Sequence, residues 1–215
     1  MAKAEKFEED LEFLLSKLRR NMESEHREKL ERLRHRLVQL HNENLVKINH
    51  SVMELVCAKH LILKEYDVDV EHLLEDGLTC DLYATKGYGN LIVEVETGFI
   101  PPEHALDPSA YLEARIASKI VRYSNQTGKF ALGVPPHYVL PIPQIVTAPP
   151  RKRTAEDLKT VKSLCDLYYQ NPPVSMEEVK NARLHVVYVI DVDNAVVKEV
   201  DPEGYIKTKL ALMSE

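Results

Sequence analysis

The chain has 215 residues, of which 44% are hydrophobic and 29% charged, and its formal net charge is −6 at pH 7. This composition is typical of a globular, well-solvated protein and excludes a disordered chain, while the length allows one domain plus an appendage. No apolar run is long enough to cross a bilayer, so no membrane association is expected. The net negative charge argues against a protein that binds nucleic acid over its whole surface, but it is compatible with a local basic groove.

Cysteine usage indicates a reducing compartment. The three cysteines, Cys57, Cys80 and Cys165, are widely spaced and odd in number, which indicates neither a disulfide framework nor a zinc site. The N-terminal sequence MAKAEKFEEDLEFLL lacks the apolar segment of a signal peptide. We therefore expect a cytoplasmic protein, and its many Lys, Arg and Glu residues lean towards a thermophilic source.

The N-terminal part of the chain predicts long helices. No Gly or Pro occurs before Gly77, so residues 3–59 lack the strongest helix breakers. Two apolar stripes with coiled-coil spacing run through it, namely Phe7, Leu11, Leu14 and Leu18, then Leu30, Leu33, Leu37 and Leu40. They are out of phase across the polar segment 21–29, which predicts either one long helix with a stutter or an antiparallel helix pair. Because so narrow a stripe needs a partner, we expect this coiled-coil arm, residues 1–48, to form a homodimer or to fold back.

Residues 49–215 predict an α/β domain. The expected order is a core helix (51–66), a short extended piece, two strands joined by a turn at 86–90 (80–84 and 90–98), a helix (109–128), a strand (129–136), a helix beginning at Thr154, and two strands (184–192 and 195–205). A proline-rich loop, 135–150, precedes the helix at Thr154. A hairpin combined with helical crossovers predicts a mixed central sheet flanked by helices.

Three acidic residues fall on the predicted hairpin. Glu94 and Glu96 are two residues apart on the second strand, so both side chains project from one face. Asp81 starts the first strand and is expected near Glu94, at the end of the hairpin distant from the turn. Because unpaired carboxylates are costly near a core, this convergence predicts a site for Mg²⁺ or Mn²⁺ with Asp81, Glu94 and Glu96 as ligands.

This arrangement resembles the PD-(D/E)xK nuclease superfamily, whose fold is restriction-endonuclease-like. The family pattern is an acid on one strand, an acid-x-Lys on the next, and a preceding helix that often supplies a Glu. Here Asp81, Glu94 and Glu96 follow a helix that carries Glu54. The resemblance covers about residues 50 to 200, mostly through element order, and it implies a restriction-endonuclease-like core, with Glu54 assisting the metal or the attacking water.

One departure concerns the lysine of that pattern, because Glu96 stands in its place. Some restriction enzymes carry Glu there, and some branches of the superfamily take a basic residue from the following helix. Lys119 and Tyr123 are one turn apart in that helix and resemble the Gln-xxx-Tyr element of the exonuclease branch. Arg115 lies one turn before Lys119 on the same face. The resemblance thus implies that Lys119 stabilises charge on the phosphate, with Arg115 and Tyr123 as nucleic-acid contacts.

A basic cluster, Arg151, Lys152 and Arg153, ends the proline-rich loop. Such a cluster can contact phosphates and bind nucleic acid independently of sequence. The histidines, His50 among them, show no metal-ligand spacing and receive no role.

Two functions remain open, beside a third interpretation in which the chain is an unrelated α/β domain whose acids are incidental. The first is a Mg²⁺-dependent DNA nuclease that uses Asp81, Glu94, Glu96, Lys119 and Glu54 and works as a homodimer. A dimer would fit cleavage of both strands, because two sites related by a two-fold axis could address them. The second is a catalytically degenerate protein of the same fold that acts as a DNA-binding or scaffold module. Loss of the motif lysine favours the second function, and retention of three acids favours the first.

Overall fold

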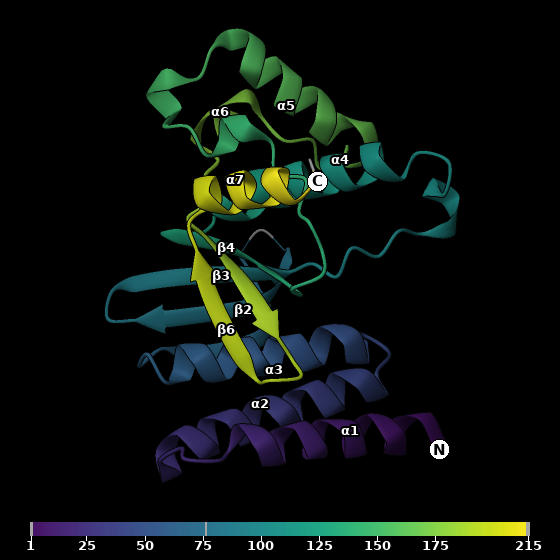
Figure 1. The fold of residues 1–215 in the computed structure, drawn as a ribbon, viewed down its shortest axis with the longest axis vertical. Helices are drawn as coiled ribbons and strands as arrows, with labels where there is room; N and C mark the ends of the chain where they lie inside the picture. Colours follow the sequence, from purple (N-terminus) through teal and green to yellow (C-terminus); the bar gives the residue numbers. More distant parts are fainter. Residues whose placement is uncertain (1, 76, 214–215) are drawn as a thin grey trace.

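The computed structural model describes residues 2–75 and 77–213 and shows an α/β architecture. A six-stranded mixed sheet with the order β1-β2-β3-β4-β5-β6 lies between two layers of helices (Figure 1). The strands are β1 (Asp67–Leu73), β2 (Thr79–Lys86), β3 (Gly89–Val95), β4 (Lys129–Val134), β5 (Val186–Asp191) and β6 (Val196–Val200). The first three strands and the last pair are antiparallel, whereas β3, β4 and β5 are parallel. This confirms the predicted mixed sheet flanked by helices.

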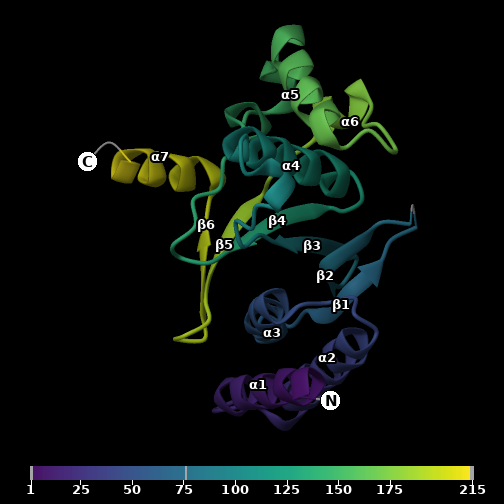
Figure 2. The same ribbon diagram turned by 90° about the vertical axis from the view of Figure 1, so that its right-hand side faces the viewer.

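The helices divide between the two faces of the sheet. One layer holds α1 (Ala2–Leu18), α2 (Ser24–Asn42) and α3 (Ile48–Ile62). The other holds α4 (Pro108–Ser124), α5 (Ala155–Tyr168), α6 (Met176–Asn181) and α7 (Pro202–Met213) (Figure 2). Short 3-10 turns lie in the connections, at Pro102–His104, Gln144–Val146 and Pro150–Lys152. Two apolar clusters follow from this layering, because residues alternate along β3: Leu91 and Val93 face α3, whereas Ile92 packs on the α4 side.

The N-terminal arm is an antiparallel helix pair that folds back on the sheet layer. Its turn contains Asn21 at φ 62°, a conformation that asparagine tolerates better than most residues. Both leucine stripes are buried and share one apolar cluster with α3 and the sheet. The stripe that suggested a dimer is therefore covered within the chain, and a homodimer through these helices would have to use their other faces.

The C-terminal end corrects one prediction. The strand expected at 195–205 ends at Val200, and α7 begins at Pro202. The physical reason is an N-terminal cap: the Asp201 carboxylate accepts a hydrogen bond from the Gly204 N–H at 2.8 Å, and proline suits the first helical position. The helix predicted to begin at Thr154 is confirmed: Thr154 is its N-cap and forms a capping box with Asp157.

Two secondary-structure elements, β1 and α6, are more extensive than the sequence predicted. The short extended piece expected before the hairpin is a complete edge strand, β1, which pairs with β2. A short helix, α6, was not predicted at all. In the described residues, no helix is both long and apolar enough to cross a membrane.

Candidate active site

The hairpin strands β2 and β3 separate at the acidic residues. Their ladder runs from the turn to the pair Leu82 and Val93. Beyond that pair, side chains replace backbone partners: the Asp81 N–H donates to Glu94 Oε1 at 3.0 Å, and the Val95 N–H donates to Asp81 Oδ2 at 2.5 Å. The two strands therefore diverge beyond this pair and leave a wedge-shaped opening between them. The carboxylates of Glu94 and Asp81 accept the backbone N–H hydrogen bonds that a strand partner would otherwise accept.

Helix α4 supplies two cations to this wedge. Lys119 Nζ lies 2.9 Å from Glu94 Oε2, 2.5 Å from Glu96 Oε1 and 4.0 Å from Asp81 Oδ2. One turn earlier, Arg115 Nε donates to both oxygens of Glu96 at 3.0 Å, and its Nη1 donates to Tyr111 Oη at 3.3 Å. The helix thus brings Lys119 and Arg115 to the acids of the hairpin, as their spacing one turn apart predicts.

Burial and pairing separate the two glutamates electrostatically. Burial, reinforced by the charge of Asp81, raises the pKa of Glu94 to about 8. Burial also disfavours the charged form of Glu96, but Lys119 and Arg115 outweigh it and hold the pKa of this carboxyl below its ordinary value. Burial acts against the charged form of Lys119 as well, yet the three neighbouring acids raise its pKa well above the ordinary lysine value. Lys119 is therefore a permanent cation at this site.

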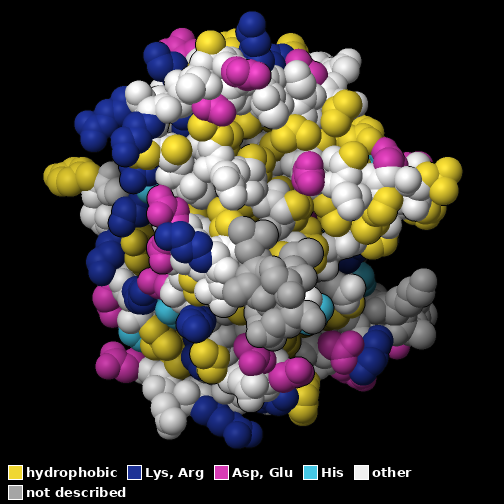
Figure 3. Space-filling view, turned by 45° about the horizontal axis from the view of Figure 1, so that its top comes forward, with side chains coloured by type: hydrophobic (Ala, Val, Ile, Leu, Met, Phe, Trp, Pro, Cys, Tyr) yellow, Lys and Arg dark blue, Asp and Glu magenta, His cyan; other side chains and the backbone are white. Residues whose placement is uncertain are grey.

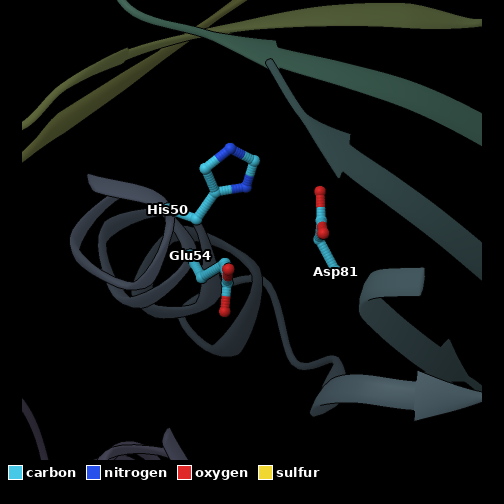
Figure 4. A group of neighbouring side chains, drawn as sticks. All are labelled: His50, Glu54 and Asp81. Atoms are coloured by element: carbon cyan, nitrogen blue, oxygen red, sulfur yellow. The ribbon is translucent and has the colours of Figure 1, made fainter. Parts of the chain in front are cut away.

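Helix α3 contributes a second half to the site, from the other layer. Glu54 is fully buried, and neither of its oxygens has a hydrogen-bond partner among the described residues. His50 lies one turn before it, and both side chains point towards Asp81 (Figure 4). One ligand atom from each of the three residues lies within 4.8 Å of the other two. The wedge in the sheet is what lets groups from both helix layers meet at Asp81.

In this second half, burial favours the neutral forms of both Glu54 and His50, and a bound cation would have to displace the proton of Glu54. Burial raises the pKa of Glu54 well above its ordinary value, and the charge of Asp81 raises it further. Burial lowers the pKa of His50, which favours a neutral imidazole. A neutral imidazole and two carboxylates are good ligands for a divalent metal ion, and a cation would neutralise the buried Glu54 carboxylate. The chemistry of the donor set therefore fits a divalent ion between His50, Glu54 and Asp81.

This grouping differs from the ligand set expected from the sequence. Asp81 was expected to share a cation with Glu94 and Glu96, whereas those two glutamates contact Lys119. A metal role for Glu94 and Glu96 remains a prediction. His50 was missed, and the signal was present: it lies four residues before Glu54, a spacing that puts both on one face of a helix.

The remaining predicted contacts are divided between the site and the surface. Tyr123, one turn after Lys119, donates its hydroxyl to the Thr79 carbonyl at 2.7 Å and so ties α4 to the start of β2. Arg151 and Lys152 are exposed in the turn before α5, which lies on the outer side of α4 (Figure 1). Lys and Arg side chains gather along the left edge of the face in Figure 3, so positive charge is unevenly spread on a net acidic chain.

Arg153 has a structural role that the sequence did not indicate. Its guanidinium donates to backbone carbonyls at 2.6 to 3.2 Å, those of Val146, Ala148, Val179, Lys180 and Ala182. These bonds join the proline-rich loop to α6. The donors of Arg153 are therefore used within the chain, which leaves Arg151 and Lys152 as the predicted phosphate contacts of the basic cluster.

A groove of about 700 Å³ is lined by sequence neighbours of the site residues rather than by the site carboxylates themselves. Its walls include Asn49 and Met53, which adjoin His50 and Glu54 on α3, and Thr97, which follows Glu96. In comparisons with protein-family models, with curated proteins and with solved structures, nothing matches this chain. Function therefore has to be inferred from the residues of the site itself.

Proposed function

We propose that this protein is a divalent-metal-dependent nuclease that hydrolyses phosphodiester bonds in DNA. The observation that carries the proposal is Glu54: a fully buried carboxylate without a hydrogen-bond partner in the described chain, beside His50 and Asp81. Burial raises the pKa of this carboxyl well above its ordinary value, so without a cation it is neutral, and leaving its buried oxygens unpaired still costs on the order of 1–3 kcal/mol. Proteins keep such groups where a ligand or catalysis requires them.

His50, Glu54 and Asp81 would hold the ion. When bound, the ion would polarise a phosphoryl oxygen and lower the pKa of a water molecule. An imidazole beside two carboxylates shifts the preference from Mg²⁺ towards Mn²⁺ or another transition ion. Mn²⁺ is therefore the first ion to test, with Mg²⁺ as the physiological comparison.

Lys119 would stabilise the charge that builds on the phosphate as water forms a new bond to phosphorus and a phosphorus–oxygen bond breaks. Its ammonium is fixed by Glu94 and Glu96 before any substrate arrives, so it needs no reorganisation. Glu96, held by Lys119 and Arg115, would act as a positioning residue for these two cations. Arg115 is partly exposed and would contact a neighbouring phosphate.

The proposed core is restriction-endonuclease-like, with its lysine moved from the second strand to the following helix. In this proposal, Lys119 supplies the positive charge that the strand position of Glu96 lacks. A homodimer would place two such sites against both strands.

The second candidate is a catalytically degenerate nuclease-fold protein that binds DNA or acts as a scaffold. The observation that favours it is the pairing of Lys119, whose ammonium already has two carboxylate partners. In that case the same surface would bind nucleic acid without cutting it.

The test is Mn²⁺- and Mg²⁺-dependent cleavage of plasmid and branched DNA by the wild type, Asp81→Asn and Glu54→Gln. The matched control is Asp166→Asn, which removes an acid paired with Lys162 on the surface of α5. We expect cleavage by the wild type and the control, and a loss of at least about 100-fold in the two site variants. Equal cleavage by all four proteins, or by none, contradicts the proposal.

A further inference from the structure

The groove lined by sequence neighbours of the site residues has the dimensions of a ligand site. Its volume of about 700 Å³ falls in the range of about 300–1,000 Å³ that small-molecule pockets occupy. Besides α3, its walls come from the segment after β3, from Pro135, Pro136 and His137, and from the turn between β5 and β6. A nucleotide is of suitable size to enter it.

Phe99 is an exposed aromatic ring on the wall next to Glu96. Its side chain is 63% exposed, although a phenyl ring gains most from burial. The turn that presents it depends on Gly98, which has φ +76° and would bring an added Cβ within 2.6 Å of the Tyr138 ring. Tyr138 therefore packs directly against the Gly98 backbone, and Phe99 is held at the groove by this close contact rather than by burial of its own ring.

The groove is electrostatically polar. Lys47 Nζ lies 5.7 Å from the centroid of the Phe99 ring and so brings positive charge to it. The lining at the end of β5 and in the turn to β6 includes Asp191, Asp193 and Asn194, and the Asp191 carboxylate accepts hydrogen bonds from the backbone and side-chain N–H groups of Asn194. Phosphates are attracted to Lys47 and repelled by the acids, whereas amino groups on the edge of a base can donate to carboxylate and amide oxygens. A nucleotide would enter with its base in the groove and its phosphate outside.

We infer that this groove binds one unpaired nucleotide of the substrate strand, with its base stacked on Phe99 and its backbone on the Lys47 side. The inference rests on the proposed function, and it narrows the substrate class to DNA with a single-stranded end, overhang or flap. A base inside a continuous duplex cannot reach an aromatic ring in a groove without leaving its stack. Stacking on an aromatic side chain tolerates any base, so no sequence preference is expected.

The experiment measures binding without cleavage. Hairpin oligonucleotides with a 3′ overhang, a 5′ overhang or a blunt end carry the fluorescent base 2-aminopurine at the terminus, and the wild-type protein is used in EDTA. We expect quenching of 2-aminopurine in one or both overhangs and not in the blunt hairpin. Phe99→Ala should weaken overhang binding by roughly ten-fold, whereas Phe99→Trp should preserve it.

Two controls separate this inference from the proposed function. Phe13→Ala removes an equally exposed ring (64%) on α1 and should leave binding unchanged. Glu54→Gln should retain quenching, because the groove does not need the metal. Overhang quenching without cleavage by any protein contradicts the nuclease and supports the groove. Equal binding of blunt and overhanging hairpins, or full quenching by Phe99→Ala, overturns the groove even if the wild type cleaves DNA.

Discussion

The ammonium group of Lys119 lies 2.5 Å from the carboxylate of Glu96, the residue that would take the lysine position under the proposed resemblance to the PD-(D/E)xK pattern. A helix and a strand that are separate in sequence thus bring positive charge to that position. Glu94 is the second partner of Lys119, at 2.9 Å. This ion-paired group links the hairpin to α4, and its removal should affect both stability and activity.

Lys119→Met should lower the free energy of unfolding by about 3–5 kcal/mol, because it removes the cation paired with buried Glu94 and one of the two cations paired with buried Glu96. It should also reduce any nuclease activity by at least about 100-fold. Urea denaturation and cleavage assays measure the two effects. Lys162→Met is the control: its pair with Asp166 is on the surface of α5, so the change should cost no more than about 1 kcal/mol. Equal stability of the two variants would contradict a buried pairing role for Lys119.

Glu54→Gln should raise the melting temperature in EDTA by about 2 °C or more, because it removes a carboxyl whose charged form is disfavoured by complete burial. The same change should abolish the stabilisation by Mn²⁺, which in the wild type should reach about 5 °C or more at saturating ion. Differential scanning fluorimetry measures both. Asp10→Asn, a change in a surface pair with Lys6, should alter neither. An unchanged Mn²⁺ shift in Glu54→Gln would exclude Glu54 as a ligand.

Stability in EDTA should fall as the pH rises from about 5 to about 8. Burial raises the pKa of Glu94 from 4.5 to about 8 and that of Glu71 from 4.5 to about 7. The folded protein therefore retains protons that the unfolded chain loses in this window, so each rise in pH favours the unfolded chain. Urea titrations at several pH values check the slope, and Glu71→Gln should reduce it. A free energy of unfolding that rises with pH over this window would show that these two groups do not dominate.

Arg153→Met should destabilise the protein by about 2–4 kcal/mol, because several carbonyl groups lose a charged hydrogen-bond donor. Arg151→Met, two residues away on an exposed turn, should leave stability unchanged and should reduce the salt dependence of DNA binding by about one unit of slope. Urea denaturation and binding titrations at several salt concentrations distinguish the two roles. Equal stability of the two variants would contradict the structural role of Arg153 and would support its original prediction as a phosphate contact.

Leu37→Ala should cost about 2–5 kcal/mol, as expected for a fully buried leucine. The unfolding transition should remain single, because the arm shares its apolar cluster with α3 and the sheet. Phe13→Ala, on the exposed side of the same helix pair, should have little effect. An arm that melts separately, with the rest of the protein unchanged, would show that residues 1–48 are an independent unit.

Local patterns were sufficient for much of the fold. The alternation of Leu91, Val93 and Val95 with Ile92, Glu94 and Glu96 predicts a strand that is buried on both faces and carries its acids on one of them. The spacing of Arg115, Lys119 and Tyr123 predicts one helical face. The strand predicted at 195–205 is present but ends at Val200, because Asp201 and Pro202 begin α7. The β-branched run had outweighed this cap signal in the prediction.

The sequence by itself determined which residues share a strand or a helical face, because those relations depend on backbone periodicity over a few residues. It thereby predicted the acids of the hairpin and the basic residues of α4. Only the tertiary structure decided what meets across the wedge between β2 and β3: Lys119 with Glu94 and Glu96, and His50 with Glu54 and Asp81. It also decided that Arg153 is used by carbonyl groups and that the leucine stripes of the arm are buried on α3. These contacts join elements far apart in the chain, and their geometry follows from the packing of whole layers.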